Sequence, residues 1–294
     1  MPLPRIIFDT SAINALEDGG FSSEPLMKAL DCGFEVILTA MSAEEIISNK
    51  SPERREALLF RFGRLLSSAL CLWPPHEIVR LQIESHHTNP AQFQWKRYDV
   101  RARDYERAIP VRDFDDDVCV QQRKEQFAVQ EKFARMWKGL RPHLDAILVK
   151  DPSKRPTSFR AAVEIAVRNG GVLWAFGQAL YEHVSGSKPA EAEIRAFMDI
   201  CPPFRAACYA LVMAWYTGSL RAPDGSPTAG RNDLLMATYL PYCDRFVTAD
   251  WAQATEFREI ATEANIPCEV VPFKDFDSGF AVAQCHDKGP GSGL

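Results

Sequence analysis

The stretch RIIFDTSA at residues 5–12 decides the fold class. It is a short apolar run that ends on an acid, Asp9, and continues into small polar residues that suit the start of a helix. Apolar runs that are continuous, as this one is, are typical of parallel strands buried on both faces of a sheet. The stretch therefore predicts a buried parallel strand with a carboxylate at its carboxyl end.

Further runs of the same kind follow along the chain and extend this prediction to a whole sheet. They lie at residues 35–38, 69–73, 245–248 and 268–273. Helical patterns separate them, at residues 51–68, 76–87 and 251–264. Strands that alternate with helices predict an α/β doubly wound fold with a central parallel sheet.

The middle of the chain has a different pattern. Between about 89 and 228 the sequence shows no convincing strand, and it predicts helices at 118–140, 159–168, 172–184 and 203–218. We therefore expect an α/β core in two parts and a disordered tail. The core occupies residues 1–88 and 229–280, the all-helical insertion 89–228 and the tail 281–294.

Composition excludes several classes of protein. The 294 residues are 46% hydrophobic and 25% charged, which is ordinary for a globular chain. No apolar stretch is long enough for a transmembrane helix, and the first residues lack the long apolar region and cleavage site of a signal peptide, so we do not expect secretion. None of the eight cysteines forms a CxxC pair, so a zinc knuckle is not indicated. We expect a cytoplasmic protein without a membrane partner.

The charge is distributed unevenly. Residues 1–50 carry 3 basic and 8 acidic side chains, residues 231–294 carry 5 and 10, and the middle carries 26 and 21. A basic middle between acidic ends is consistent with binding of a nucleic-acid backbone, although a solvated helix face is the alternative. The candidate phosphate-binding residues include Arg101, Arg103, Lys154 and Arg155.

Asp9 and Asp250 end predicted strands, Glu45 lies in the helix start after the second strand, and Asp233 precedes the fourth strand. In open parallel sheets the ligand crevice lies outside the carboxyl ends of the strands. Carboxylates gathered there repel one another, and a bound divalent cation resolves the repulsion. Oxygen ligands without nearby histidine or cysteine favour Mg²⁺ or Mn²⁺. The alternative for each acid is that it caps a helix.

The same motifs resemble those of the PIN-domain family of metal-dependent nucleases. The opening IIFDTSA at 6–12 is similar to the first motif of the family, and VILT at 36–39 followed by Glu45 is similar to the second. DLLMAT at 233–238 and FVTAD at 246–250 look like the third and fourth motifs, with the two acids 17 positions apart. The resemblance covers about 1–88 and 229–275, and the long insertion departs from the compact members.

The resemblance implies a PIN-like three-layer α/β/α fold and hydrolysis of phosphodiester bonds, most often in RNA. It implies that Asp9, Glu45, Asp233 and Asp250 are catalytic, and that Asp9, Asp233 and Asp250 bind one or two Mg²⁺ or Mn²⁺ ions. The side chains expected to orient carboxylates or waters are Thr10, Ser11, Asn232 and Thr248.

Some alternatives stay open at this point. Glu44 and Glu45 are adjacent on a predicted helix, so only one faces the crevice, and we favour Glu45. A phosphatase of the haloacid dehalogenase type also begins with an acid at a strand end, but it requires an aspartate where Ser11 stands. A non-catalytic binding or scaffold module on a PIN-like fold is the other alternative. A homo-oligomer and a monomer are both compatible with these patterns.

Overall fold

The computed structural model describes residues 3–18, 33–66, 70–96, 99–100, 156–168, 171–221 and 231–276, together with eight single positions between 117 and 131. Most of the predicted helix at 118–140 and the tail at 281–294 lie outside these residues. All structural statements below concern the described residues.

The sheet has five parallel strands and one short antiparallel strand at its edge, in the order β4-β3-β2-β1-β5-β6. In the central register, Ile7 of β1 pairs with Ile37 of β2 and with Phe246 of β5. The α/β class predicted from the sequence is therefore confirmed. The strands are β1 (Arg5–Phe8), β2 (Glu35–Thr39), β3 (Leu70–Leu72), β4 (Asp99–Val100), β5 (Arg245–Thr248) and β6 (Glu269–Pro272).

The strand β4 corrects the prediction that the insertion is all-helical. It lies within residues 89–228 and pairs antiparallel with β3, Cys71 opposite Val100. A two-residue strand carries too little of the alternating or continuous apolar pattern to be recognised in the sequence. Its pairing depends on the exposed edge of β3, which only the assembled sheet provides.

Helices cover both faces of the sheet because alternate strand residues point to opposite sides. Ile6 and Phe8 pack in one hydrophobic cluster and Ile7 packs in the other. The first cluster includes residues of α1 (Thr10–Asp18), α3 (Ala40–Ile47) and α4 (Pro52–Leu66). The second includes residues of α5 (Pro75–Thr88), η3 (Leu235–Tyr242) and α13 (Trp251–Glu263).

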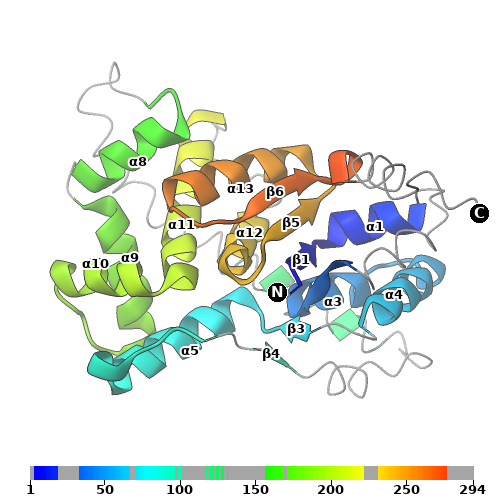
Figure 1. The fold of residues 1–294 in the computed structure, drawn as a ribbon, viewed down its shortest axis with the longest axis horizontal. Coiled ribbons are helices and arrows are strands. Elements are labelled where there is room, and N and C mark those ends of the chain that lie inside the picture. Colours follow the sequence, from blue (N-terminus) through cyan, green and yellow to red (C-terminus); the bar gives the residue numbers. More distant parts are fainter. Residues whose placement is uncertain are drawn as a thin grey trace, which may run out of the picture.

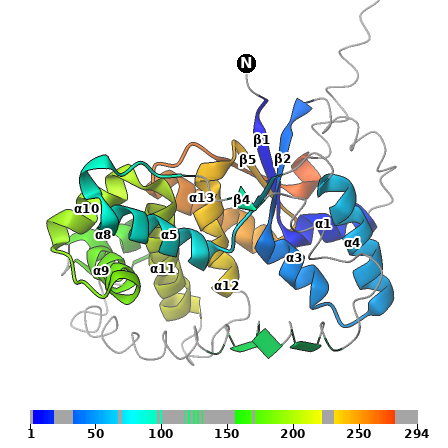
Figure 2. The same ribbon diagram turned by 90° about the horizontal axis from the view of Figure 1, so that it is seen from below.

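The helices of the insertion extend the second cluster. Figures 1 and 2 show them at the end of the molecule opposite α1, α3 and α4. Their bounds are α8 (Phe159–Arg168), α9 (Val172–Ser185), α10 (Glu191–Ile200) and α11 (Pro202–Arg221). Two shorter helices lie at its ends: η1 (Pro90–Gln92) is at the start of the insertion, and α12 (Arg231–Leu234) follows it. The helix α10 was not predicted from the sequence, and it buries Ile194, Phe197 and Met198.

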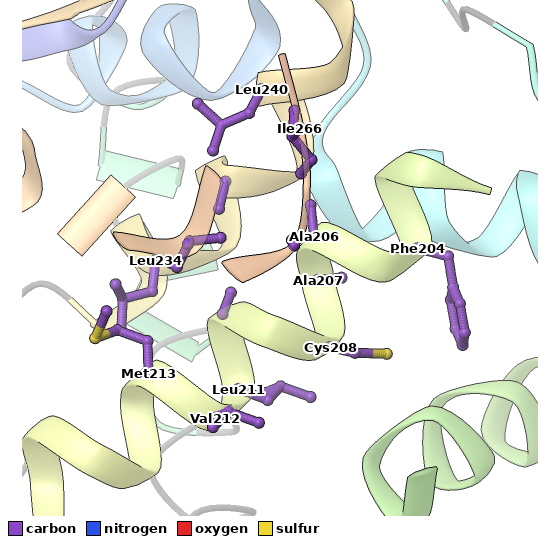
Figure 3. Packing of buried hydrophobic residues seen from close by; sticks show 14 of the residues in the cluster. Phe204, Ala206, Ala207, Cys208, Leu211, Val212, Met213, Leu234, Leu240 and Ile266 are labelled. Carbon is purple, nitrogen blue, oxygen red and sulfur yellow. The ribbon is translucent and has the colours of Figure 1, made fainter. Parts of the chain in front are cut away.

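The helix α11 joins the insertion to the sheet. As its apolar sequence predicts, it is buried on several sides, with Phe204, Cys208 and Val212 fully enclosed. Figure 3 shows its side chains in one cluster with Leu234 and Ile266, which belong to the second part of the α/β core. The insertion and one face of the sheet therefore share a single hydrophobic core.

No single helix in the described ranges is long and apolar enough to cross a membrane. One pair, Glu191–Ile200 with Pro202–Thr217, passes the same test of length and composition together, but it is bent by 115°.

Candidate active site

The order of the strands places a topological switch point between β1 and β5, and the region outside the carboxyl ends of these two strands is called the crevice below. The chain passes from β1 to β2 to β3 in one direction and later returns on the other side of β1 to form β5 and β6. Such a reversal is the topological switch point at which open parallel sheets bind ligands, outside the carboxyl ends of the strands. Asp9 follows β1 directly, and its backbone N–H donates to the Val247 carbonyl of β5 at 3.1 Å.

Asp9 is held firmly at this position. Its side chain is only 4% exposed. Oδ1 accepts a hydrogen bond from the Ala12 backbone N–H at 2.7 Å, and Oδ2 accepts one from Thr248 Oγ1 at 2.8 Å. The bond to Ala12 means that Asp9 caps α1, as the alternative interpretation expected. Burial, with a smaller contribution from the nearby charge of Asp233, raises the pKa of Asp9 to about 6 despite these donors.

Ser11 connects the end of β1 with the end of β5. Its hydroxyl lies 2.9 Å from both carboxylate oxygens of Asp9 and donates its single proton to them. It accepts bonds from the backbone N–H groups of Ala249 at 2.8 Å and Asp250 at 3.2 Å. Of the three hydroxyls that were expected to orient carboxylates or waters, those of Ser11 and Thr248 form hydrogen bonds with Asp9, and that of Thr10 does not.

One residue of this network, Gln253, was not predicted from the sequence. It is buried on α13, and its side-chain oxygen lies 2.7 Å from Thr248 Oγ1. Thr248 has one proton, which Gln253 and Asp9 therefore share. A signal existed in the sequence, because Gln253 stands three residues after the helix cap Asp250, where α13 turns a polar side chain back towards the strand.

Glu45 reaches the crevice from α3. That helix begins at the carboxyl end of β2, where Thr39 Oγ1 accepts a bond from the Ser42 N–H at 3.1 Å and caps it. Burial, with smaller contributions from the charges of Asp233 and Asp9, raises the pKa of Glu45 to about 7. The pKa of Glu44 is raised by burial and then by Glu125. Of the two adjacent glutamates, Glu45 therefore interacts with the other crevice acids.

Asp233 and Asp250 complete the group. Asp233 lies on α12, and burial followed by the charge of Asp250 raises its pKa to about 6. Asp250 caps α13, because its Oδ1 accepts bonds from the N–H groups of Ala252 at 2.8 Å and Gln253 at 3.1 Å. The four acids thus interact in pairs, Asp9 with Asp233 and Glu45, and Asp233 with Glu45 and Asp250.

Two observations bear on whether a metal ion fits this group of acids, and they point in opposite directions. Among the described side chains, no three of the His, Cys, Asp and Glu residues are arranged to hold one ion. The donor chemistry, in contrast, suits a hard divalent cation, because the acids are oxygen donors whose charged forms are penalised by burial and mutual repulsion. Thr10 Oγ1 is buried and has no hydrogen-bond partner. It lies close enough to Glu45, however, to lower the pKa of that acid. Binding of Mg²⁺ or Mn²⁺ by Asp9, Asp233 and Asp250 stays a prediction.

The other predicted site residues are the four basic residues of the insertion and Asn232. Arg101, Arg103, Lys154 and Arg155 lie outside the described residues, and so does the side chain of Asn232. Their expected contacts with nucleic acid and with the acids of the crevice stay predictions.

Comparisons with models of known protein families, with curated proteins and with solved structures find no match to this chain.

Proposed function

We propose that this protein is a PIN-like, Mg²⁺- or Mn²⁺-dependent nuclease that hydrolyses phosphodiester bonds, with RNA favoured as its substrate. One observation carries the proposal. Four acids that come from four separate elements interact electrostatically at the switch point of a parallel sheet. They are the same four residues that resemble the acidic motifs of the PIN family.

The electrostatics of the four acids favour the binding of a cation. Burial and neighbouring acids, not a basic side chain, set the pKa values of Asp9, Glu45 and Asp233. Keeping like charges together in a desolvated crevice destabilises the fold unless protons or a cation neutralise them. A divalent ion neutralises several carboxylates at once, which an isolated structural cap would not require.

The protein side chains have separable roles in this proposal. A bound Mg²⁺ or Mn²⁺ would lower the pKa of a coordinated water and neutralise charge on the phosphate. Asp9 is oriented in advance by Ala12, Ser11 and Thr248, which lowers the cost of reorganisation during the reaction. Glu45, with a pKa of about 7, can accept or release a proton near neutral pH.

The test is a cleavage assay with matched variants. Labelled RNA and DNA strands are incubated with purified protein in Mn²⁺, in Mg²⁺ and in EDTA. We expect metal-dependent cleavage that Glu45→Gln lowers by about 100-fold or more. Glu44→Gln is the matched control, since it changes the adjacent acid, and it should retain activity. Cleavage that persists in EDTA, or that Asp9→Asn leaves intact, would refute the proposal.

A non-catalytic nucleic-acid-binding module is the second candidate. It is favoured by the finding that no three described side chains are arranged for one metal ion. This candidate predicts binding of RNA without cleavage in excess Mn²⁺. Calorimetric titration separates the two, because the nuclease should bind Mn²⁺ and lose that binding in Asp9→Asn, whereas the module should show no Mn²⁺ binding at the crevice.

A further inference from the structure

We propose that the Trp251 side chain is a stacking platform for a nucleobase of a single-stranded nucleic acid, with Lys274 beside it to contact the backbone phosphate. The identity of the polymer rests on the proposed nuclease function. The platform itself rests on the position, the exposure and the cation contact of Trp251.

Trp251 lies next to an acid of the candidate active site. It is the first residue of α13 and follows Asp250 directly. Asp250 is tied down by its cap bonds to α13 and by the bond of its own N–H to Ser11 Oγ. Neighbouring Cα atoms lie about 3.8 Å apart, so the backbone of Trp251 is held within a few ångströms of an acid of the candidate active site.

The exposure of Trp251 is unusual. Its side chain is 62% exposed, although tryptophan is among the side chains that gain most from burial. The other apolar side chains of α13, such as Phe257 and Ile260, are fully buried in the core beneath. Trp251 therefore does not contribute to that core, and its aromatic surface is available to a ligand.

Lys274 supplies a cation at the same place. It follows β6, which is parallel to β5, so both residues lie at the carboxyl edge of the sheet. Its Nζ is 5.3 Å from the centre of the Trp251 ring, a cation–π distance. This contact orients the ring and leaves an ammonium group that can bind a phosphate oxygen.

The chemistry of the crevice selects single strands. Carboxylates repel the phosphate backbone, so affinity beside them must come from a contact that does not depend on charge. Stacking of a base on an aromatic ring is such a contact, and it contributes about 1–3 kcal/mol per base. It requires an unpaired base whose face is accessible, which a duplex interior does not offer.

The test measures binding in EDTA, where a metal-dependent nuclease does not cut. Fluorescence anisotropy is recorded with labelled RNA and DNA single strands of about 12 nucleotides, within the size range of single-strand sites. We expect Trp251→Ala to weaken binding about 5- to 150-fold, which corresponds to the stacking range. Trp251→Phe should retain most of the affinity. Phe60→Ala is the matched control, because Phe60 is 61% exposed on α4 and should have no effect.

Two further arms identify the contacts. A strand of abasic sites should bind wild type and Trp251→Ala with equal affinity, because it has no bases to stack on residue 251 of either protein. Lys274→Ala should lower the slope of log affinity against log salt by about 0.7, the value for one phosphate contact in a single strand. Comparison of the RNA and DNA arms shows which polymer the platform prefers.

The platform is refuted if Trp251→Ala binds both single strands as wild type does, or if wild type binds neither. It is also refuted if Trp251→Ala weakens binding of abasic and normal strands equally. The cleavage assay in Mn²⁺ is read separately, so an active nuclease with an indifferent Trp251 refutes the platform alone. A protein that binds through Trp251 but never cuts refutes the nuclease alone.

Discussion

Asp9 combines two tasks that oppose each other energetically. As the cap of α1 it accepts a hydrogen bond from the Ala12 N–H and stabilises the helix. As a buried carboxylate near Asp233 it is destabilised by desolvation and like charge, which is why its pKa rises to about 6. A side chain that keeps the cap and loses the charge separates the two tasks.

We therefore predict that Asp9→Asn abolishes metal-dependent cleavage and leaves the metal-free protein as stable as wild type or more stable. The amide keeps an acceptor for the Ala12 N–H and removes the repulsion. Thermal melts in EDTA check this prediction. A large fall in melting temperature would instead show that Asp9 acts mainly as a structural cap.

The pH dependence of stability follows from the same shift. The pKa of Asp9 is 3.8 when unperturbed and about 6 in the folded protein. The folded state thus binds the proton more tightly, and the stability that this contributes is present below pH 4 and lost as the pH rises through 6. Metal-free wild type should lose about 1–3 kcal/mol of unfolding free energy between pH 4 and pH 7 relative to Asp9→Asn. Parallel curves for the two proteins would contradict the raised pKa.

At the scale of elements, α13 depends on Asp250 for its start. The Asp250 side chain accepts bonds from two N–H groups of the first turn, and its charge also interacts with Asp233. Serine is as good a cap as aspartate but carries no charge.

We predict that Asp250→Ala costs about 0.5–2 kcal/mol of stability, whereas Asp250→Ser stays within about 0.5 kcal/mol of wild type. Both variants should lose metal-dependent cleavage. Urea unfolding and the Mn²⁺ assay measure the two effects independently. Full activity of Asp250→Ser would remove Asp250 from the catalytic group and leave it only as a cap.

The contact between α9 and α10 depends on a glycine. A Cβ placed on Gly177 of α9 would lie 2.7 Å from Ile194 Cγ2 of α10, closer than packed atoms approach. We predict that Gly177→Ala destabilises the protein by about 1–3 kcal/mol through overpacking. Gly63→Ala on α4 is the control, because its Cβ would meet no atom within 4 Å. Gly63→Ala should be neutral or stabilising by up to about 1 kcal/mol in the same urea titration.

At the scale of the whole molecule, the shared core determines how the protein unfolds. Phe204 of α11 and Ile7 of β1 belong to one hydrophobic cluster, so the insertion has no core of its own among the described residues. The insertion and the sheet should therefore unfold together.

We predict that Phe204→Ala costs about 3–5 kcal/mol and weakens the sheet as much as the insertion. Hydrogen-exchange mass spectrometry measures this, with peptides from β1 and β2 compared with peptides from α9 and α11. All four should exchange faster to a similar extent. Faster exchange confined to the α8–α11 helices would show that the insertion is an independent unit.

Local patterns in the sequence determined the elements and the positions of the acids. The apolar run at 5–8 predicted β1 and its end at Asp9, because a strand and the cap that follows it depend on residues only a few positions apart. The same holds for the run at 245–248 and the cap Asp250. These features depend on hydrophobicity and hydrogen bonding between near neighbours, which the sequence displays directly.

Only the tertiary structure decided how these elements meet. The order of the strands placed β5 beside β1, and this brought the Ser11 hydroxyl to the N–H of Asp250, 239 positions along the chain. The tertiary structure also brings Glu45, rather than Glu44, into electrostatic interaction with Asp233. It adds β4 to the edge of the sheet and packs the insertion and the sheet in one hydrophobic cluster. Each of these depends on burial and charge between distant segments. No short stretch of sequence contains that information, because desolvation and like-charge repulsion arise only once the chain has brought those segments together.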